Sequence, residues 1–229
     1  DIWNAKTLYE LYKKAYTPWE WQKALKEYAT SLGLDFFSSP FDLSAVDFLE
    51  ELNVPAYKIA SFEINDIPLI RKVARTGKVV IISTGIANLE DIELAIRVCK
   101  EENNENVVLL KCLSAYPAPF EEMNLRVIRN MKETFECQVG LSDHSLGSET
   151  AIAAVTLGAK IVEKHLTLSR EDGGPDAMFS MEPHEFSNMV RQIHNVEKAL
   201  GRVTYELTKK QIEQRSGSRS LFVVENIRK

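Results

Sequence analysis

The sequence predicts an α/β protein built as part of a (β/α)8 TIM barrel, and three observations lead there. Short apolar runs typical of strands alternate with amphipathic stretches typical of helices, at intervals of roughly 20–30 residues. Polar residues follow the carboxyl end of every run, which favours a barrel over an open doubly wound sheet, because all strand ends of a barrel face one site. No run is followed by the GxGxxG turn of a dinucleotide-binding protein.

Six strands are expected, because six β-branched or apolar runs resemble strands buried on both faces of a parallel sheet. They cover Asp35–Ser38, Ala56–Ser61, Lys78–Ser83, Val107–Cys112, Gln138–Ser142 and Lys160–His165. A complete barrel has eight strands, so we expect two further strands before residue 1.

Helices are expected before and between these strands. The first two cover Thr7–Tyr12 and Trp19–Leu32, and Asn88 is expected to cap a third. A long helix should begin at Pro183 and end at Gly201. We expect residues 1–207 to form a partial barrel domain. Residues 208–229 should contain a polar linker at Gln211–Ser220 and then a strand at Ser220–Val224, which has no partner strand in the sequence.

Composition excludes several classes of protein. With 28 Lys and Arg against 33 Asp and Glu, the net charge is −5, whereas non-specific nucleic-acid binding needs a basic surface. No apolar run approaches the length of about 20 residues that a membrane span needs. The three cysteines form no CxxC motif and favour a reducing compartment such as the cytoplasm. Cys99 and Cys112 are expected to be structural.

Two of the four histidines end consecutive strands. His144 and His165 should therefore point into the same site, where two imidazoles could bind one divalent metal and leave positions open for water or substrate. They could equally be two hydrogen-bonded histidines in a polar cleft. His184 and His194 lie on the long final helix and are expected to be solvated or packed.

Three lysines lie in or at the ends of strands, where a buried ammonium must be paired, deprotonated or facing a ligand. Lys58 could bind an anion, form a Schiff base, or extend to the rim of the barrel. Lys164 alternates out of phase with His165 and should point towards the helices. Lys58 and Lys111 could form an anion cage with the strand-end hydroxyls of Ser39, Ser61, Ser83, Thr84, Ser114 and Ser142.

Several motifs, in this order along the chain, resemble those of the sialic acid synthase family. They are Lys58-Ile59-Ala60-Ser61-Phe62-Glu63, Ser83-Thr84-Gly85, Tyr116-Pro117, Gly140-Leu141-Ser142-Asp143-His144-Ser145, Glu163-Lys164-His165 and Gly174-Pro175-Asp176. Three segments are most similar to the pseudaminic acid branch of that family. They are Leu8-Tyr9-Glu10-Leu11-Tyr12, Thr17-Pro18-Trp19-Glu20-Trp21 and Ser38-Ser39-Pro40-Phe41.

The resemblance implies an enzyme that condenses phosphoenolpyruvate with an N-acetylated sugar and releases phosphate. For the pseudaminic acid branch the sugar would be 2,4-diacetamido-2,4,6-trideoxy-L-altrose, and the alternatives are N-acetylneuraminate or legionaminate synthesis. The family fold is a (β/α)8 barrel followed by a small antifreeze-like (SAF) domain that is swapped in a homodimer. Residues 208–229 would then begin that domain.

The resemblance also implies roles for individual residues. His144 and His165 would bind the metal, with Mn²⁺ expected and Mg²⁺ or Co²⁺ as alternatives. The positions expected to hold phosphoenolpyruvate are Ser39, Lys58, Ser61, Ser83 and Ser142, together with Ser114 where the family often has Asn. The positions expected to face the sugar are Phe41, Glu63, Tyr116 and Asp176. Lys58 and Glu63 join the two histidines as the expected catalytic residues.

Two further readings stay open. A Schiff-base aldolase would use Lys58 as a nucleophile towards pyruvate. A non-catalytic fragment of a split synthase is the alternative from another class, since the family's first two strands and the arginine of its C-terminal domain do not occur in the chain.

Overall fold

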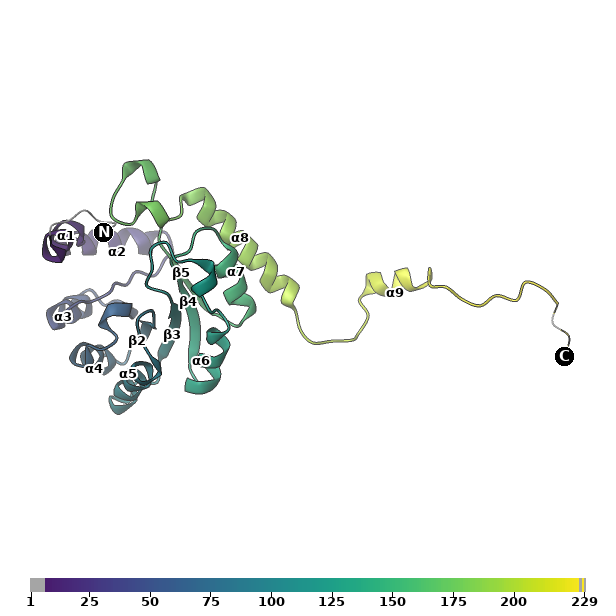
Figure 1. Cartoon of the computed structure of the whole chain (residues 1–229), viewed down its shortest axis with the longest axis horizontal. Coiled ribbons are helices and arrows are strands. Elements are labelled where there is room, and N and C mark those ends of the chain that lie inside the picture. Colours follow the sequence, from purple (N-terminus) through teal and green to yellow (C-terminus); the bar gives the residue numbers. More distant parts are fainter. Residues whose placement is uncertain (1–6, 227, 229) are drawn as a thin grey trace. The chain divides into compact units, whose positions relative to one another are not determined.

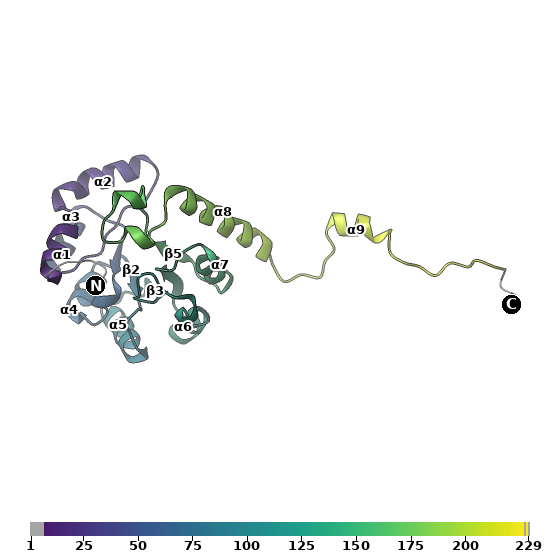
Figure 2. The ribbon, with the colours of Figure 1, turned by 45° about the horizontal axis from the view of Figure 1, so that its top comes forward.

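A computed structural model describes residues 7–226 and 228. Within this part of the chain, five strands form one parallel sheet in the order β1, β2, β3, β4, β5. The strands are β1 (Ala56–Ile59), β2 (Val79–Ser83), β3 (Val107–Cys112), β4 (Gln138–Asp143) and β5 (Ile161–Lys164). The sheet curls, and helices pack around its convex side (Figures 1 and 2). The fold is a TIM-barrel-like half barrel, so the predicted fold class is confirmed.

Four helices connect each strand to the next, as parallel strands require: α4 (Ile67–Arg75), α5 (Leu89–Glu101), α6 (Val127–Phe135) and α7 (Glu149–Thr156). The helices α1 (Leu8–Ala15), α2 (Trp19–Ser31) and α3 (Leu43–Glu51) precede β1, and α8 (Pro183–Leu200) and α9 (Lys209–Arg215) follow β5. Local sequence sets several of their ends. Asn88 and Asp91 form a capping box at the start of α5, and Gly201 follows α8 with a φ of 51°.

The two faces of the sheet pack differently. The outward face, which includes Tyr57, Ile82 and Leu109, joins the large core shared with the helices. The inward face forms a smaller apolar cluster that includes Ile81 and Leu110. Gly140 lies there because a Cβ at this position would stand 2.6 Å from Leu110 Cδ2. Side chains alternate between faces along a strand, so the inward positions continue into the polar residues at the carboxyl ends.

One predicted strand is wrong. Residues 35–37 form no strand, and Ser38 makes only an isolated parallel bridge to Tyr57, in which Lys58 N donates to Ser38 O at 3.2 Å. Leu34, Phe37 and Asp35 are exposed. This segment has β1 on one side, and in the described part of the chain no strand pairs with its other side. With β1 as its single neighbour, the segment forms one bridge and does not extend it into a ladder.

The second compact unit, Leu200–Lys229, also differs from expectation. The expected linker, Gln211–Ser220, is partly helical because its first five residues belong to α9. A capping box between Thr208 and Gln211 begins this helix. Ser220–Val224 forms no strand, and Leu221 and Val224 are almost fully exposed because no partner strand pairs with them in the described residues. That residues 208–229 begin an antifreeze-like domain stays a prediction. Among the residues described, no helix is both long and apolar enough to cross a membrane.

Candidate active site at the carboxyl ends of the strands

A cavity of about 370 Å³ lies where the carboxyl ends of the strands meet. Eight of the predicted site residues line it: Ser39, Lys58, Ser61, Ser83, Tyr116, Ser142, His144 and His165. Ala60, Phe62, Cys112, Glu163 and Lys164 complete the lining. The lining residues come from each of the five strands and the segments around them, so the site depends on the curl of the whole sheet.

Lys58 places a buried ammonium in this cavity. The residue is 7% exposed, and its Nζ donates to Ile59 O at 3.0 Å. The nearest carboxylate is Glu163, whose Oε2 lies 3.7 Å away. Burial lowers the pKa of Lys58, and the charge of Glu163 opposes that shift. An ammonium with so little solvation gains strongly from an anion placed beside it.

Hydroxyl groups line the same cavity as the ammonium. Ser61 Oγ accepts hydrogen bonds from Ile86 N and from Ser114 Oγ, both at 3.0 Å, which leaves its own proton for a further acceptor. The Ser83 hydroxyl is buried and has no hydrogen-bond partner in the described residues. A Cβ on Gly85 would stand 2.8 Å from Ser61 Oγ, so the close approach of this turn requires glycine. A buried hydroxyl without a partner indicates a place for a ligand atom.

His144 is held in one orientation. Its Nδ1 lies 3.0 Å from Leu113 O, so Nδ1 carries the proton and Nε2 is the unprotonated nitrogen. Burial lowers the pKa of His144, and the nearby His165 lowers it further, which favours the neutral ring. Cys112 Sγ lies 3.9 Å from Nδ1. The ring therefore presents a lone pair on the side away from the carbonyl.

His165 faces His144, with ring centroids 5.2 Å apart. Its Nδ1 lies 3.4 Å from Asp176 Oδ2, a carboxylate placed to orient the ring. Phe179 is 2% exposed and packs against both imidazoles. It also contacts Tyr116, whose ring lies 4.4 Å from that of His144. The two histidines are thus fixed by neighbours on several sides.

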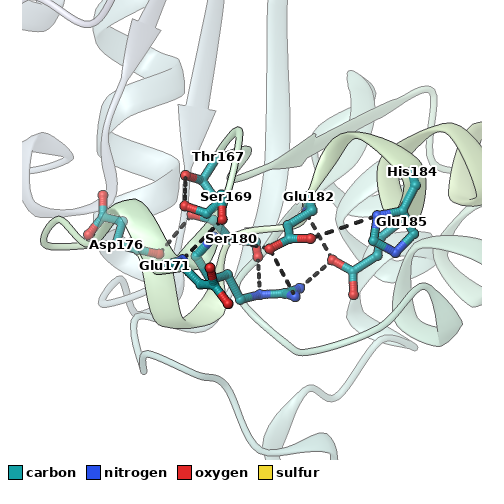
Figure 3. Close-up of polar contacts among 9 residues, drawn as sticks. Thr167, Ser169, Glu171, Asp176, Ser180, Glu182, His184 and Glu185 are labelled. Carbon is teal, nitrogen blue, oxygen red and sulfur yellow. Dashed lines mark hydrogen bonds and ion pairs between the residues drawn. The ribbon is translucent and has the colours of Figure 1, made fainter.

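The loop that carries Asp176 is tied to the start of α8 (Figure 3). Arg170 Nε donates to Ser180 O at 3.0 Å, and its guanidinium also pairs with Glu182 and Glu185. Ser180 Oγ in turn donates to Asp176 O at 2.7 Å. These contacts fix the backbone that brings the carboxylate to His165.

Glu163 is a site residue that sequence reasoning missed. Its Oε1 accepts a hydrogen bond from Ser142 Oγ at 2.6 Å, and its Oε2 faces Lys58. Strand alternation was the available signal: Glu163 stands two residues before His165 and must share its face. Cys112, expected to be structural, lines the cavity by the same rule. Phe179 comes from a short 3-10 segment and gave no such signal.

Six expected contributors do not line the cavity: Phe41, Glu63, Thr84, Lys111, Ser114 and Asp176. Ser114 and Asp176 contact residues that do, namely Ser61 and His165. Lys111 points to the outer side of β3 and lines a separate cavity with Thr84 and the start of α6, so it does not join the anion cage. Phe41 is 64% exposed. Glu63 lies outside the lining, with a buried Oε2 that has no partner in the described residues and a pKa raised by burial.

Other expectations for polar residues are confirmed. Lys164 borders the cavity, but its side chain is only 1% exposed and points towards the helices, where its Nζ lies 2.8 Å from Asp143 Oδ2 in a buried ion pair. His184 and His194 have exposed side chains beside glutamates of α8 or its start. Cys99 is buried in the core, and all three cysteines are free thiols.

The donors of the histidine pair fit a divalent metal. The two imidazoles lie close together, and His144 has a fixed tautomer with a free Nε2. Within the described residues, no group of three or more His, Cys, Asp or Glu side chains could hold a metal. An ion bound here would have two protein ligands, and substrate oxygens and water would fill its other positions.

Comparison with known proteins agrees with this geometry. The chain is 46% identical over its whole length to a pseudaminic acid synthase of Helicobacter pylori, of which it spans 67%. It is 44% identical over 184 residues to an N,N'-diacetyllegionaminic acid synthase of Campylobacter jejuni, of which it spans 55%. A crystal structure of N-acetylneuraminic acid synthetase from Leptospira borgpetersenii, 35% identical, matches 90% of this chain and 73% of that one with a TM-score of 0.83. The NeuB family matches residues 1–205, and the chain belongs to that family.

Proposed function

We propose that this chain is the catalytic part of a transferase that condenses phosphoenolpyruvate with an N-acetylated sugar to form a nonulosonic acid and phosphate. The observation that carries the proposal is the juxtaposition in one cavity of an anion site and a paired-histidine site. Lys58 and the hydroxyl of Ser83 form the first, and His144 and His165 form the second.

The anion site suits phosphoenolpyruvate, which carries a phosphate and a carboxylate. The Lys58 ammonium has one carboxylate at 3.7 Å and is otherwise shielded from solvent, so an anion would stabilise it. The hydroxyls of Ser61 and Ser83 line the same cavity and supply donors, and Ser142, whose Oγ donates to Glu163, lies beside them. Together they would hold the enol of phosphoenolpyruvate over the second site and so supply proximity.

The histidine site suits the sugar aldehyde. A divalent cation held by His144 and His165, with Mn²⁺ expected, would polarise the aldehyde oxygen of the open-chain sugar. Tyr116 lies against His144 and is placed to contact the sugar. Asp176 holds the orientation of His165 and, beyond that, could reach a sugar hydroxyl.

The reaction balances as a condensation with hydrolysis. Carbon 3 of phosphoenolpyruvate attacks the aldehyde carbon, and the aldehyde oxygen takes up a proton. Water adds to carbon 2, and the bond between carbon 2 and the phosphate oxygen breaks to release inorganic phosphate and leave the 2-keto acid. Lys58 stabilises negative charge on the phosphoenolpyruvate throughout, and in this mechanism it forms no covalent bond.

The sugar that we propose is 2,4-diacetamido-2,4,6-trideoxy-L-altrose, which would give pseudaminic acid. The support is that the relative named a pseudaminic acid synthase is 46% identical over the whole chain, whereas the N,N'-diacetyllegionaminic acid synthase is 44% identical over 184 residues. N-acetylneuraminate and legionaminate synthesis are the alternatives, since stereochemistry is decided by a few hydroxyl contacts in the pocket. We further propose a domain-swapped homodimer for the whole protein and a reducing, cytoplasmic environment for its free thiols.

The test is phosphate release from phosphoenolpyruvate by the protein expressed from its natural coding sequence. The altrose derivative, N-acetylmannosamine and the legionaminate precursor are offered in parallel, with and without Mn²⁺. We expect metal-dependent release with the altrose derivative alone. Release with another sugar would keep the family chemistry and replace the substrate. A folded protein that releases no phosphate with any sugar would favour the non-catalytic reading. Borohydride trapping of a pyruvate adduct on Lys58 would favour the aldolase.

A further inference from the structure

A buried ion pair stands directly before the two histidines. Asp143 precedes His144 on β4, Lys164 precedes His165 on β5, and the register of the sheet pairs Asp143 with Lys164. Asp143 Oδ2 lies 2.8 Å from Lys164 Nζ, and the two side chains are 0% and 1% exposed. Because strand side chains alternate, this pair faces the helices while the histidines face the cavity.

The carboxylate of Asp143 is fully satisfied. Its Oδ1 accepts hydrogen bonds from Ser145 N at 2.9 Å and from Ser145 Oγ at 2.7 Å. Its Oδ2 accepts from Thr150 Oγ1 of α7 at 2.7 Å as well as from Lys164. The same carboxylate therefore accepts hydrogen bonds from the residue after His144, from β5 and from α7.

Lys164 completes the contact around His144. Its Nζ donates to Ser145 O as well as to Asp143. Lys164, which precedes His165, therefore contacts the residues on both sides of His144: the side chain of Asp143 and the backbone of Ser145. The two histidines cannot move apart along their strands without breaking at least one of these bonds.

Energetics argues against simple stabilisation as the purpose of the pair. Burying two charges costs several kcal/mol per ion, and a buried ion pair is often no more stabilising than apolar residues of the same size. Such a pair does impose directional contacts that apolar packing lacks. The charged side chains are also too buried to touch a ligand.

We infer that Asp143 and Lys164 are positioning residues that set the spacing and orientation of His144 and His165 and so make them one divalent-metal site. The inference rests on the metal role in the proposed function. It extends that function to residues that contact neither metal nor substrate.

The first test measures Mn²⁺ affinity directly, by electron paramagnetic resonance of free Mn²⁺, in the wild-type protein and in Asp143→Asn. The variant keeps the shape of the side chain and removes its charge. We expect its dissociation constant for Mn²⁺ to rise about 10- to 100-fold, as for loss of other groups that orient metal ligands. Its affinity for phosphoenolpyruvate should be unchanged, because Lys58 and Ser83 lie on other strands.

A matched control separates positioning from stability. Val73→Ala creates a cavity in α4, at a fully buried position in the core shared with the outer face of the sheet. This substitution should lower the free energy of unfolding. Its Mn²⁺ affinity, measured at a temperature where all the variants are folded, should equal that of the wild type. The inference would be overturned if Asp143→Asn bound Mn²⁺ as tightly as the wild type. It would also be overturned if Val73→Ala weakened Mn²⁺ binding as much as Asp143→Asn does.

A milder variant keeps the inference testable if Asp143→Asn does not fold. Thr150→Val removes one of the four donors to Asp143 and leaves no charge unpaired. It should weaken Mn²⁺ binding about 2- to 10-fold, the range expected for one hydrogen bond. Unchanged binding in this variant would count against the inference. A wild-type protein that releases phosphate yet binds no divalent cation would instead overturn the metal role in the proposed function.

Discussion

The two sides of the cavity satisfy their polar groups in different ways. On the β1–β2 side, called here the anion side, Lys58 has one carboxylate at 3.7 Å and the buried Ser83 hydroxyl has no partner in the described residues. On the β4–β5 side, the histidine side, Asp143 accepts four hydrogen bonds, and His144 is oriented by Leu113 O.

The difference shows what each side is built to receive. Unpaired buried donors cost free energy in the empty protein, and a bound anion removes that cost. A metal site instead needs its ligands held at fixed positions before the ion arrives. The anion side is thus completed by its ligand, whereas the histidine side is completed by the protein.

The largest effect should come from removing a metal ligand. His144→Ala leaves His165 as a single imidazole, so we expect loss of Mn²⁺ binding and of turnover by more than the roughly 100-fold that an orienting group contributes. Metal titration and phosphate release measure both. Turnover that persists in this variant and still depends on Mn²⁺ would contradict the assignment of the histidine side.

The same substitution at two lysines should lower stability strongly at one position and hardly change it at the other. Lys164→Met leaves the buried Asp143 carboxylate without its cation and should lower the free energy of unfolding by about 3–5 kcal/mol. Lys58→Met removes an ammonium that burial already disfavours and should change it by less than about 1 kcal/mol. Urea unfolding of the two variants checks this. Equal losses would mean that the two sides do not differ as described.

Ligand binding should respond to Ser83 more weakly. Ser83→Ala removes a buried hydroxyl that has no partner in the described residues, so stability should be unchanged or slightly higher. Affinity for phosphoenolpyruvate should fall about 2- to 10-fold, the range for one hydrogen bond. Calorimetric titration measures the affinity, and thermal unfolding measures the stability. A clear loss of stability would show that the hydroxyl already has a partner in the empty protein.

The smallest effect concerns pH. An anion binds the protonated form of Lys58, and burial lowers the pKa of this group below the ordinary lysine value of 10.5. Affinity for phosphoenolpyruvate should therefore be full below the lowered pKa and decline as pH rises through it, earlier than for an ordinary lysine. Above a pH of about 7.5 the phosphate is already fully ionised, so it adds little to the change. Lys58→Arg should abolish the decline, because arginine stays protonated.

Strand periodicity explains most of what the sequence could predict. Continuous apolar runs identify β2 and β3, and the alternation of side chains places His144 and His165 on the inner face. The same rule, applied to β5, identifies Glu163. The rule also places Lys111, which stands next to the inward Cys112, on the outer face of β3, so including Lys111 in the anion cage was wrong.

Tertiary contacts decide the rest. Asp35–Ser38 has the composition of a strand but pairs only through Ser38, because a strand needs neighbours as well as β propensity. Phe179 reaches the histidines from a loop whose path is set by the contacts of Arg170. Neither result follows from local pattern, since both depend on segments that are distant in sequence or on neighbours in the sheet.

The most direct test of the account is a crossed titration of Lys58→Met and Lys164→Met with phosphoenolpyruvate and with Mn²⁺. The account predicts that Lys58→Met loses about 10- to 100-fold in affinity for phosphoenolpyruvate and keeps its affinity for Mn²⁺. Lys164→Met should lose affinity for Mn²⁺ and keep its affinity for phosphoenolpyruvate. Parallel losses of both ligands in both variants would contradict the division of the cavity into an anion side and a histidine side.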